Sequence, residues 1–138
     1  MQQHNQIFVN LAVDDLPKSK AFFAELGFGF NAQFTNEQAA SLEIGPNIYA
    51  MLLQRAFFET FTDKPVIDAR QSTEVLLCLS CQSREEVDAQ VAKAVAAGGS
   101  TWRPVQDYGF MYGHGFVDLD GHRWELMHMD LAAAPKQM

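Results

Sequence analysis

The sequence has little of what marks exported, membrane-spanning or disulfide-stabilised proteins. Its 138 residues include only two cysteines, Cys78 and Cys81, too few for the disulfide framework of a small exported domain. No stretch approaches the roughly 20 consecutive apolar residues that a transmembrane helix needs. The opening residues, MQQHNQIFV, lack the basic segment and the apolar run of a secretory signal. These absences predict a cytoplasmic protein with no membrane partner.

Positive charge is scarce as well. The chain has 10 Lys and Arg residues against 17 Asp and Glu residues, a formal net charge of −7, and the cations form no run. Because nucleic-acid binding depends largely on clustered cations, no nucleic-acid partner is expected. What the chain does have is apolar content: 48% of its residues are hydrophobic, which is enough for one core. We expect residues 5–130 to form a single domain.

Cys78 and Cys81 form a C-x-x-C motif, which also occurs in zinc sites and redox proteins. The surrounding sequence, EVLLCLSC, has the composition of a strand, and residues three apart in a strand point to opposite faces. No second Cys or His pair in the sequence completes a four-ligand zinc site. We interpret the two cysteines as structural. A redox pair is the alternative, because Cys81 lies close to the start of a predicted helix.

The first half of the chain predicts one helix among four strands. The stretch IFVNLAV alternates in the manner of a strand. Asp15 is placed to cap a helix that has Pro17 in its first turn and ends at Gly27. Further strands are expected around Phe28–Phe34, Ala39–Ile44 and Ile48–Leu53.

The second half repeats this order. After the strand EVLLCLSC, Ser83 and Glu86 fit a capping box, and Gly98-Gly99 ends the helix. Strands are expected near Thr101–Gln106, Phe110–Val117 and His122–Met129. The predicted fold class is therefore α+β, with tandem βαβββ modules at about residues 5–53 and 74–130. Residues 54–73 join the modules as a packed arm or lid, unless they form a short extra helix.

Each module should form a curved sheet with its helix on the convex side, so strand alternation decides which side chains enter the concave cup. Trp124 and Leu126 then lie under the helix, and Glu125 between them points into the cup. Glu125 is either a carboxylate satisfied by hydrogen bonds, with Arg123 as a candidate partner, or a polar anchor or general base for a ligand. The other inward positions are mainly apolar: Phe8, Asn10, Ala12, Met51, Leu76, Cys78, Ser80 and Met127.

A second group of candidates lies in YGFMYGHGF, residues 108–116. We interpret this row of polar-tipped aromatic side chains as core packing first, with the lining of a small-molecule site as the alternative. The glycines beside the row, Gly115 among them, would leave space. His114 comes near Glu125 if the hairpin register allows it. Four side chains share this face of the predicted strand: Phe110, Tyr112, His114 and Phe116.

Two stretches resemble one known family. VNLAVDDLPKSKAFFAELGF at residues 9–28 and GFVDLDGHRWEL at residues 115–126, with the duplicated order between them, resemble the glyoxalase / bleomycin-resistance / extradiol dioxygenase superfamily, also called the vicinal oxygen chelate proteins. The resemblance covers roughly residues 5–130. It implies curved mixed sheets around a cup-like pocket, and it implies a homodimer. It does not fix an activity, because members include lyases, oxygenases, epimerases and binding proteins.

The resemblance also implies where a metal would bind. In metal-using members, four strands each place one ligand in the cup, and the last ligand is a Glu. Carried onto this sequence, that Glu is Glu125, whereas the other three positions fall on or near Phe8, Met51 and Leu76. Those three side chains do not ligate a hard divalent ion, and even a Glu125–His114 pair supplies only two ligands. We therefore expect no metal cofactor, with a divalent ion held by Glu125 as the alternative.

We expect a glyoxalase-related protein that has lost the metal site and binds an apolar or aromatic metabolite or drug. The alternative is an enzyme, a lactoylglutathione-lyase-like isomerase or an extradiol-type dioxygenase, in which Glu125 and His114 are the catalytic residues. A third interpretation is a structural homodimer whose cup is filled by its own side chains. The residues expected to contact the ligand are Phe8, Asn10, Met51, Leu76, Tyr112 and Met127, with Glu125 and His114 as further polar contacts.

Overall fold

The structure is a computed structural model that describes residues 1–133. The chain divides into two compact units, Met1–Asp68 and Ala69–Met138, and the boundary falls inside the segment that joins the predicted modules. Within the described residues, no helix is both long enough and apolar enough to cross a membrane. Each unit contains one βαβββ module, which confirms the predicted α+β fold.

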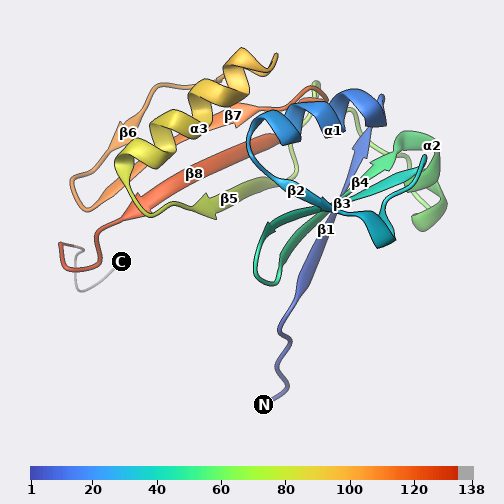
Figure 1. Ribbon diagram of the computed structural model, residues 1–138, viewed down its shortest axis with the longest axis horizontal. Helices are drawn as coiled ribbons and strands as arrows, with labels where there is room; N and C mark the ends of the chain where they lie inside the picture. The colour runs from blue at the N-terminus through green and yellow to red at the C-terminus, as the bar shows by residue number, and fades with distance from the viewer. Residues whose placement is uncertain (134–138) are drawn as a thin grey trace. The chain divides into compact units, whose positions relative to one another are not determined.

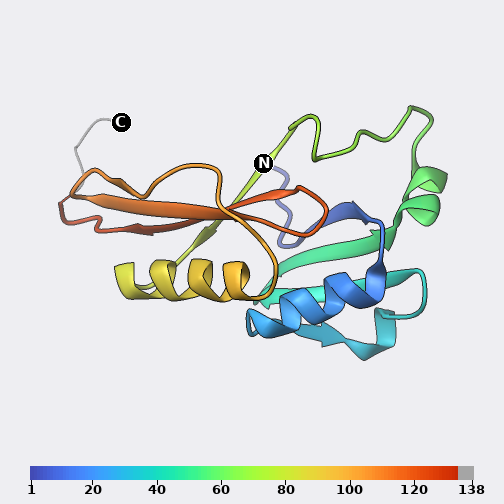
Figure 2. The same ribbon diagram turned by 90° about the horizontal axis from the view of Figure 1, so that it is seen from above.

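The first unit is a four-stranded sheet covered on one face by a helix (Figure 2). The strand order is β1-β4-β3-β2; β1 and β4 are parallel and the other pairs are antiparallel. The elements are β1 (Ile7–Val13), α1 (Leu16–Glu25), β2 (Gly29–Asn31), the 3-10 turn η1 (Ala32–Phe34), β3 (Ala39–Gly45) and β4 (Ile48–Gln54).

Local signals set the limits of α1. The Asp15 side chain accepts a hydrogen bond from the Lys18 backbone N–H at 3.1 Å, and Pro17 lies in the first turn. Gly27, at a φ of 95°, ends the helix in a conformation that suits glycine. The helix buries one apolar face against the sheet, and the core of the first unit includes Leu11, Val13, Leu16, Phe22, Phe23, Leu42 and Leu52.

The second unit has the same architecture, with a longer helix lying along one face of its sheet (Figure 1). The strand order is β5-β8-β7-β6, and β5 is parallel to β8. The predicted capping box is present, because Ser83 Oγ accepts from the Glu86 N–H at 3.0 Å and the Glu86 carboxylate accepts from the Gln82 N–H. The elements are β5 (Leu76–Ser80), α3 (Arg84–Ala96), β6 (Gln106–Asp107), β7 (Met111–Val117) and β8 (Arg123–Met129).

Two predicted strands are shorter in the structure than the sequence suggested. Of residues 101–106, only Gln106 is in a strand, because Pro104 has no N–H to donate to a sheet. The strand expected at Phe28–Phe34 stops at Asn31, whose side chain accepts from the Gln33 N–H and turns the chain into η1.

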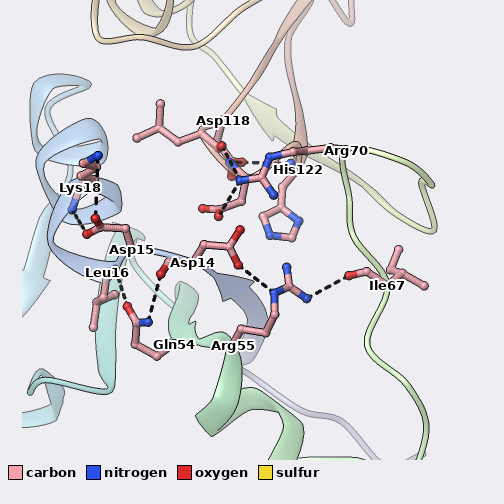
Figure 3. A network of polar contacts seen from close by, with 12 residues as sticks. Asp14, Asp15, Leu16, Lys18, Gln54, Arg55, Ile67, Arg70, Asp118 and His122 are labelled. Atoms are coloured by element: carbon pink, nitrogen blue, oxygen red, sulfur yellow. Dashed lines mark hydrogen bonds and ion pairs between the residues drawn. The ribbon is translucent and has the colours of Figure 1, made fainter.

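The joining segment contains a short extra helix, which was one of the two interpretations of residues 54–73. α2 (Arg55–Phe58) continues into the 3-10 turn η2 (Glu59–Phe61), and the rings of Phe57 and Phe61 meet edge to face at 5.0 Å. Arg55 Nε donates to Asp14 Oδ1 at 2.8 Å, and its Nη1 donates to the Ile67 carbonyl at 3.2 Å (Figure 3). Arg55 therefore links the start of the joining segment to Asp14, which follows β1, and to Ile67 further along the same segment.

Candidate functional site

Glu125 lies on the face of the second sheet that is turned away from α3. Its neighbours in β8, Trp124 and Leu126, are buried in the core that α3 covers, so alternation sends Glu125 to the other side. Cys78 of β5 is its direct partner on one side and Gly115 of β7 on the other. We call this surface the Glu125 face. It carries Leu76, Cys78, Ser80, Arg123, Glu125 and Met127.

The turn before β8 is built to fix where that strand begins. Asp118 is buried, and its Oδ1 accepts the backbone N–H groups of Asp120 and His122, both at 3.0 Å. Its Oδ2 accepts from Trp124 Nε1, also at 3.0 Å. The Asp118 carboxylate therefore bonds both to the turn and to Trp124, the first buried residue of β8. By fixing Trp124, it also fixes the position of Glu125, the next residue in the strand.

Gly121 and Arg70 complete this turn. Gly121 has a φ of 92°, and a Cβ there would lie 2.6 Å from the Arg70 backbone N. Arg70 Nη2 donates to the Leu119 carbonyl at 3.1 Å and lies 3.4 Å from Asp120 Oδ1 (Figure 3). The DLDG stretch that carries the family resemblance therefore has a structural role here: it holds the chain that leads into Glu125.

The ionic partner of Glu125 is Arg103. Arg103 Nη2 lies 3.4 Å from Glu125 Oε2, and the two side chains are 36% and 22% exposed. The sequence suggested Arg123 instead, and that expectation is wrong: the Arg123 guanidinium lies over the Trp102 ring, 5.0 Å from its centroid. Arg103 was missed because it belongs to an irregular segment with no periodic pattern, so nothing in the sequence indicated which strand it would contact.

Trp102 covers the strand next to Glu125. A Cβ at Gly115 would lie 2.5 Å from Trp102 Cη2 and 2.6 Å from the Trp124 carbonyl oxygen. The guanidinium of Arg103 also lies by this indole, 5.6 Å from its centroid. The space expected beside Gly115 is therefore filled by an aromatic ring, and that ring is flanked by two arginines.

The two cysteines have the properties of structural thiols. Cys78 is on the Glu125 face, and partial burial together with the nearby Glu125 carboxylate raises its pKa. Burial and the Glu86 carboxylate raise the pKa of Cys81 to about 11. Reactive thiols need a lowered pKa, so these shifts favour the structural interpretation over a redox pair.

His114 and Tyr112 lie on the opposite face from Glu125. In the β7–β8 register, His114 pairs with Leu126, so both point toward the side that α3 covers. His114 Nε2 lies 3.2 Å from the Arg103 carbonyl oxygen. Tyr112 OH donates to Asp88 Oδ1 of α3 at 2.6 Å, and this bond raises the tyrosine pKa. The Glu125–His114 pair, which the sequence allowed for one hairpin register, is therefore not formed, because the observed register places Gly115 opposite Glu125.

The first unit presents an equivalent face with different side chains. Phe8 is half exposed and stacks on Tyr49, with ring centroids 5.0 Å apart. Asn10 pairs with Met51, as Cys78 pairs with Glu125 in the second unit. The duplicated pairing thus makes Met51 the counterpart of Glu125, and it makes Phe8 the counterpart of Leu76.

The donors at these four positions do not fit a divalent metal ion. Phe8 and Met51 of the first unit offer a hydrocarbon ring and a thioether, and Leu76 of the second offers only hydrocarbon. A catalytic ion is usually held by about three protein ligands with nitrogen or oxygen donors. Within residues 1–133, no group of three or more His, Cys, Asp or Glu side chains is arranged to hold a metal. Of the four positions, Glu125 is the one that carries an oxygen donor suited to such an ion.

Comparison with known proteins identifies the class. The chain matches the Glyoxalase/Bleomycin resistance protein/Dioxygenase superfamily over residues 5–126 and belongs to it. No curated protein sequence matches the chain. Among solved structures, a hypothetical protein from S. aureus is 28% identical, with 92% of this chain and 95% of the other covered and a TM-score of 0.78.

Two further structures show the same fold. A glyoxalase-related enzyme from Fulvimarina pelagi is 22% identical, with 93% of this chain and 88% of the other covered and a TM-score of 0.77. A genomically encoded fosfomycin resistance protein from Listeria monocytogenes is 20% identical, with 95% and 98% covered and a TM-score of 0.67. The predicted family and fold are thus confirmed, whereas the particular activity is not given by these similarities.

Proposed function

We propose that this chain is a small-molecule-binding member of the superfamily that works without the superfamily's divalent metal. The observation that carries the proposal is the donor set: Phe8, Met51 and Leu76 occupy three positions where metal-using members place ligands. The fourth position, Glu125, is already paired with a cation of the chain itself, Arg103. Because the Arg103 guanidinium already compensates the charge of the Glu125 carboxylate, a metal ion would gain less electrostatic energy by binding there.

The ligand that this arrangement favours is an apolar or aromatic metabolite or drug. In the second unit, Leu76 is half exposed on the Glu125 face, and Met127 lies on the same face and adapts easily to different ligand shapes. In the first unit, the Phe8–Tyr49 stack offers an exposed aromatic surface. Glu125 and its partner Arg103 are the proposed polar contacts. We further propose a cytoplasmic homodimer, as expected from the sequence and the superfamily.

The enzyme alternative requires acid–base chemistry by Glu125 with His114. Because the register places these residues on opposite faces of the sheet, the geometry does not favour this alternative. Turnover of a hemithioacetal or a catechol that is lost in Glu125→Gln would overturn the binding-only proposal.

Metal titration tests the proposal. We expect nickel, zinc, manganese and ferrous ions to shift the melting temperature of the wild type no more than that of Glu125→Ala, since one carboxylate does not hold an ion at useful affinity. Differential scanning fluorimetry measures the shifts, and Cys78→Ser controls for zinc bound to the exposed thiol. One ion bound tightly per chain in the wild type, and lost in Glu125→Ala, would contradict the proposal.

A further inference from the structure

Beside the Glu125 face, the two arginines that lie by Trp102 outnumber the one acid paired with them, although the chain as a whole is acidic. Arg103 and Arg123 both lie by the Trp102 ring, and Glu125 is the one acid paired with either of them in the part of the chain described. Two guanidinium groups and one carboxylate leave one positive charge uncompensated, in a chain whose formal charge is −7. Among residues 1–133, Arg123 has no ion-pair partner. A local excess of positive charge attracts anions.

The bond between Arg103 and Glu125 is a weak one. It is a single contact of 3.4 Å between two partly exposed side chains, and such pairs contribute little to stability. In addition, Arg103 Nε is buried and has no hydrogen-bond acceptor within the described residues. A buried donor without a partner is unfavourable, so the resting arrangement leaves Arg103 incompletely satisfied. A ligand that accepts from this guanidinium would remove that penalty.

We propose that Arg103 is the ligand-binding cation of this protein and that the ligand is a carboxylate attached to an aromatic or apolar body. A planar carboxylate can accept from Nε and one Nη of a guanidinium at the same time, which matches the unpaired donor. Arg103 exchanges Glu125 for the ligand by a change of its side-chain conformation. This inference rests on the proposed function and specifies the ligand class.

The surroundings of Arg103 suit the apolar part of such a ligand. The Trp102 indole lies directly over Gly115, where any side chain at position 115 would clash with it. Leu76 and Met127 are on the same face of the sheet, and Leu76 is 51% exposed. An aromatic ring next to a cation and aliphatic side chains forms a surface for a flat apolar molecule with one negative end.

Two probes of the same shape test the inference in the full chain: 2-naphthoate and its neutral analogue 2-naphthamide. In ¹H–¹⁵N spectra, the Nε–H signal of Arg103 and the indole N–H signal of Trp102 report directly on the proposed site. We expect naphthoate to shift both signals and to bind at least about ten times more tightly than naphthamide. We expect Arg103→Gln to remove this preference and Arg103→Lys, which keeps the charge without the planar fork, to keep only part of it.

Arg84→Gln is the matched control, because Arg84 is an exposed arginine of the same unit that is paired with Asp107 instead. It should leave the preference for naphthoate unchanged. If both probes bind equally well to the wild type, this inference is overturned while the proposed function stands. If neither probe binds at millimolar concentration, this inference is also overturned, and the metal titration decides the proposed function independently. If Arg103→Gln does not fold, the wild-type spectra decide between the outcomes. A shift of the Arg103 Nε–H signal on addition of naphthoate supports the inference, and the lack of such a shift overturns it.

Discussion

At the scale of single residues, Gly115 shows how a missing side chain shapes the Glu125 face. The Trp102 indole occupies the volume that a Cβ at position 115 would need, with Cη2 only 2.5 Å from it. Gly115→Ala should therefore lower the free energy of unfolding by about 1–3 kcal/mol, since it forces the ring or the strand to move. Urea denaturation followed by circular dichroism measures the change.

Gly113 is the matched control for this prediction. It lies two residues earlier in β7, and a Cβ there would meet nothing closer than the Leu126 carbonyl oxygen at 3.5 Å. Gly113→Ala should be neutral or should stabilise the protein slightly, because alanine reduces the entropy of the unfolded chain. Equal losses of stability in the two variants would show that the Trp102 contact is not the cause.

Residue-scale features also divide into those that the sequence predicted and those that it could not. The placement of Glu125 on the opposite sheet face from Trp124, and the burial of Trp124, followed from alternation, which is local. The partner of Glu125 did not, because the Arg103–Glu125 contact joins residues in different parts of the chain. The face on which His114 lies depends on hairpin register, and a shift of one residue reverses it.

At the scale of elements, α3 depends on its capping residue. Ser83 Oγ is the acceptor for the Glu86 N–H at the start of the helix. Ser83→Ala should destabilise the protein by about 1 kcal/mol, because a helix N–H then loses its partner. Thermal or urea denaturation measures this loss. Ser72→Ala, at an exposed position outside any helix or strand, should change stability by less than about 0.5 kcal/mol. A Ser83→Ala variant as stable as Ser72→Ala would contradict the assignment of the cap.

Both main helices were predicted with nearly their observed limits, because caps and stop signals are local. Asp15, Ser83 and the glycines after each helix act within a few residues of themselves. Strand limits were less well predicted, since a strand exists only where a partner strand continues. Residues 101–105 have a strand-like composition, yet Pro104 interrupts the pairing.

At the scale of the whole molecule, duplication is the feature that the sequence revealed most clearly. The two units share element order and strand order, and in each the first strand is parallel to the last. Equivalent positions have nevertheless diverged: Met51 corresponds to Glu125, and Asn10 corresponds to Cys78. The proposed polar contacts, Glu125 and Arg103, thus belong to the second unit alone, so we expect the two faces to have different roles in binding.

The edge strand of the first unit supports the proposed homodimer. β1 is at the edge of its sheet, and Ile7 on it is 63% exposed next to the exposed Ile48. An apolar edge of this kind favours association, because burying an isoleucine is worth about 1.5–3 kcal/mol. We expect sedimentation equilibrium to give about twice the chain mass of 15.4 kDa. Ile7→Lys should weaken the dimer at least about tenfold, whereas Val95→Lys, at a similarly exposed apolar position on α3, should not. A monomer at all concentrations, or equal weakening by both variants, would contradict an interface at this edge.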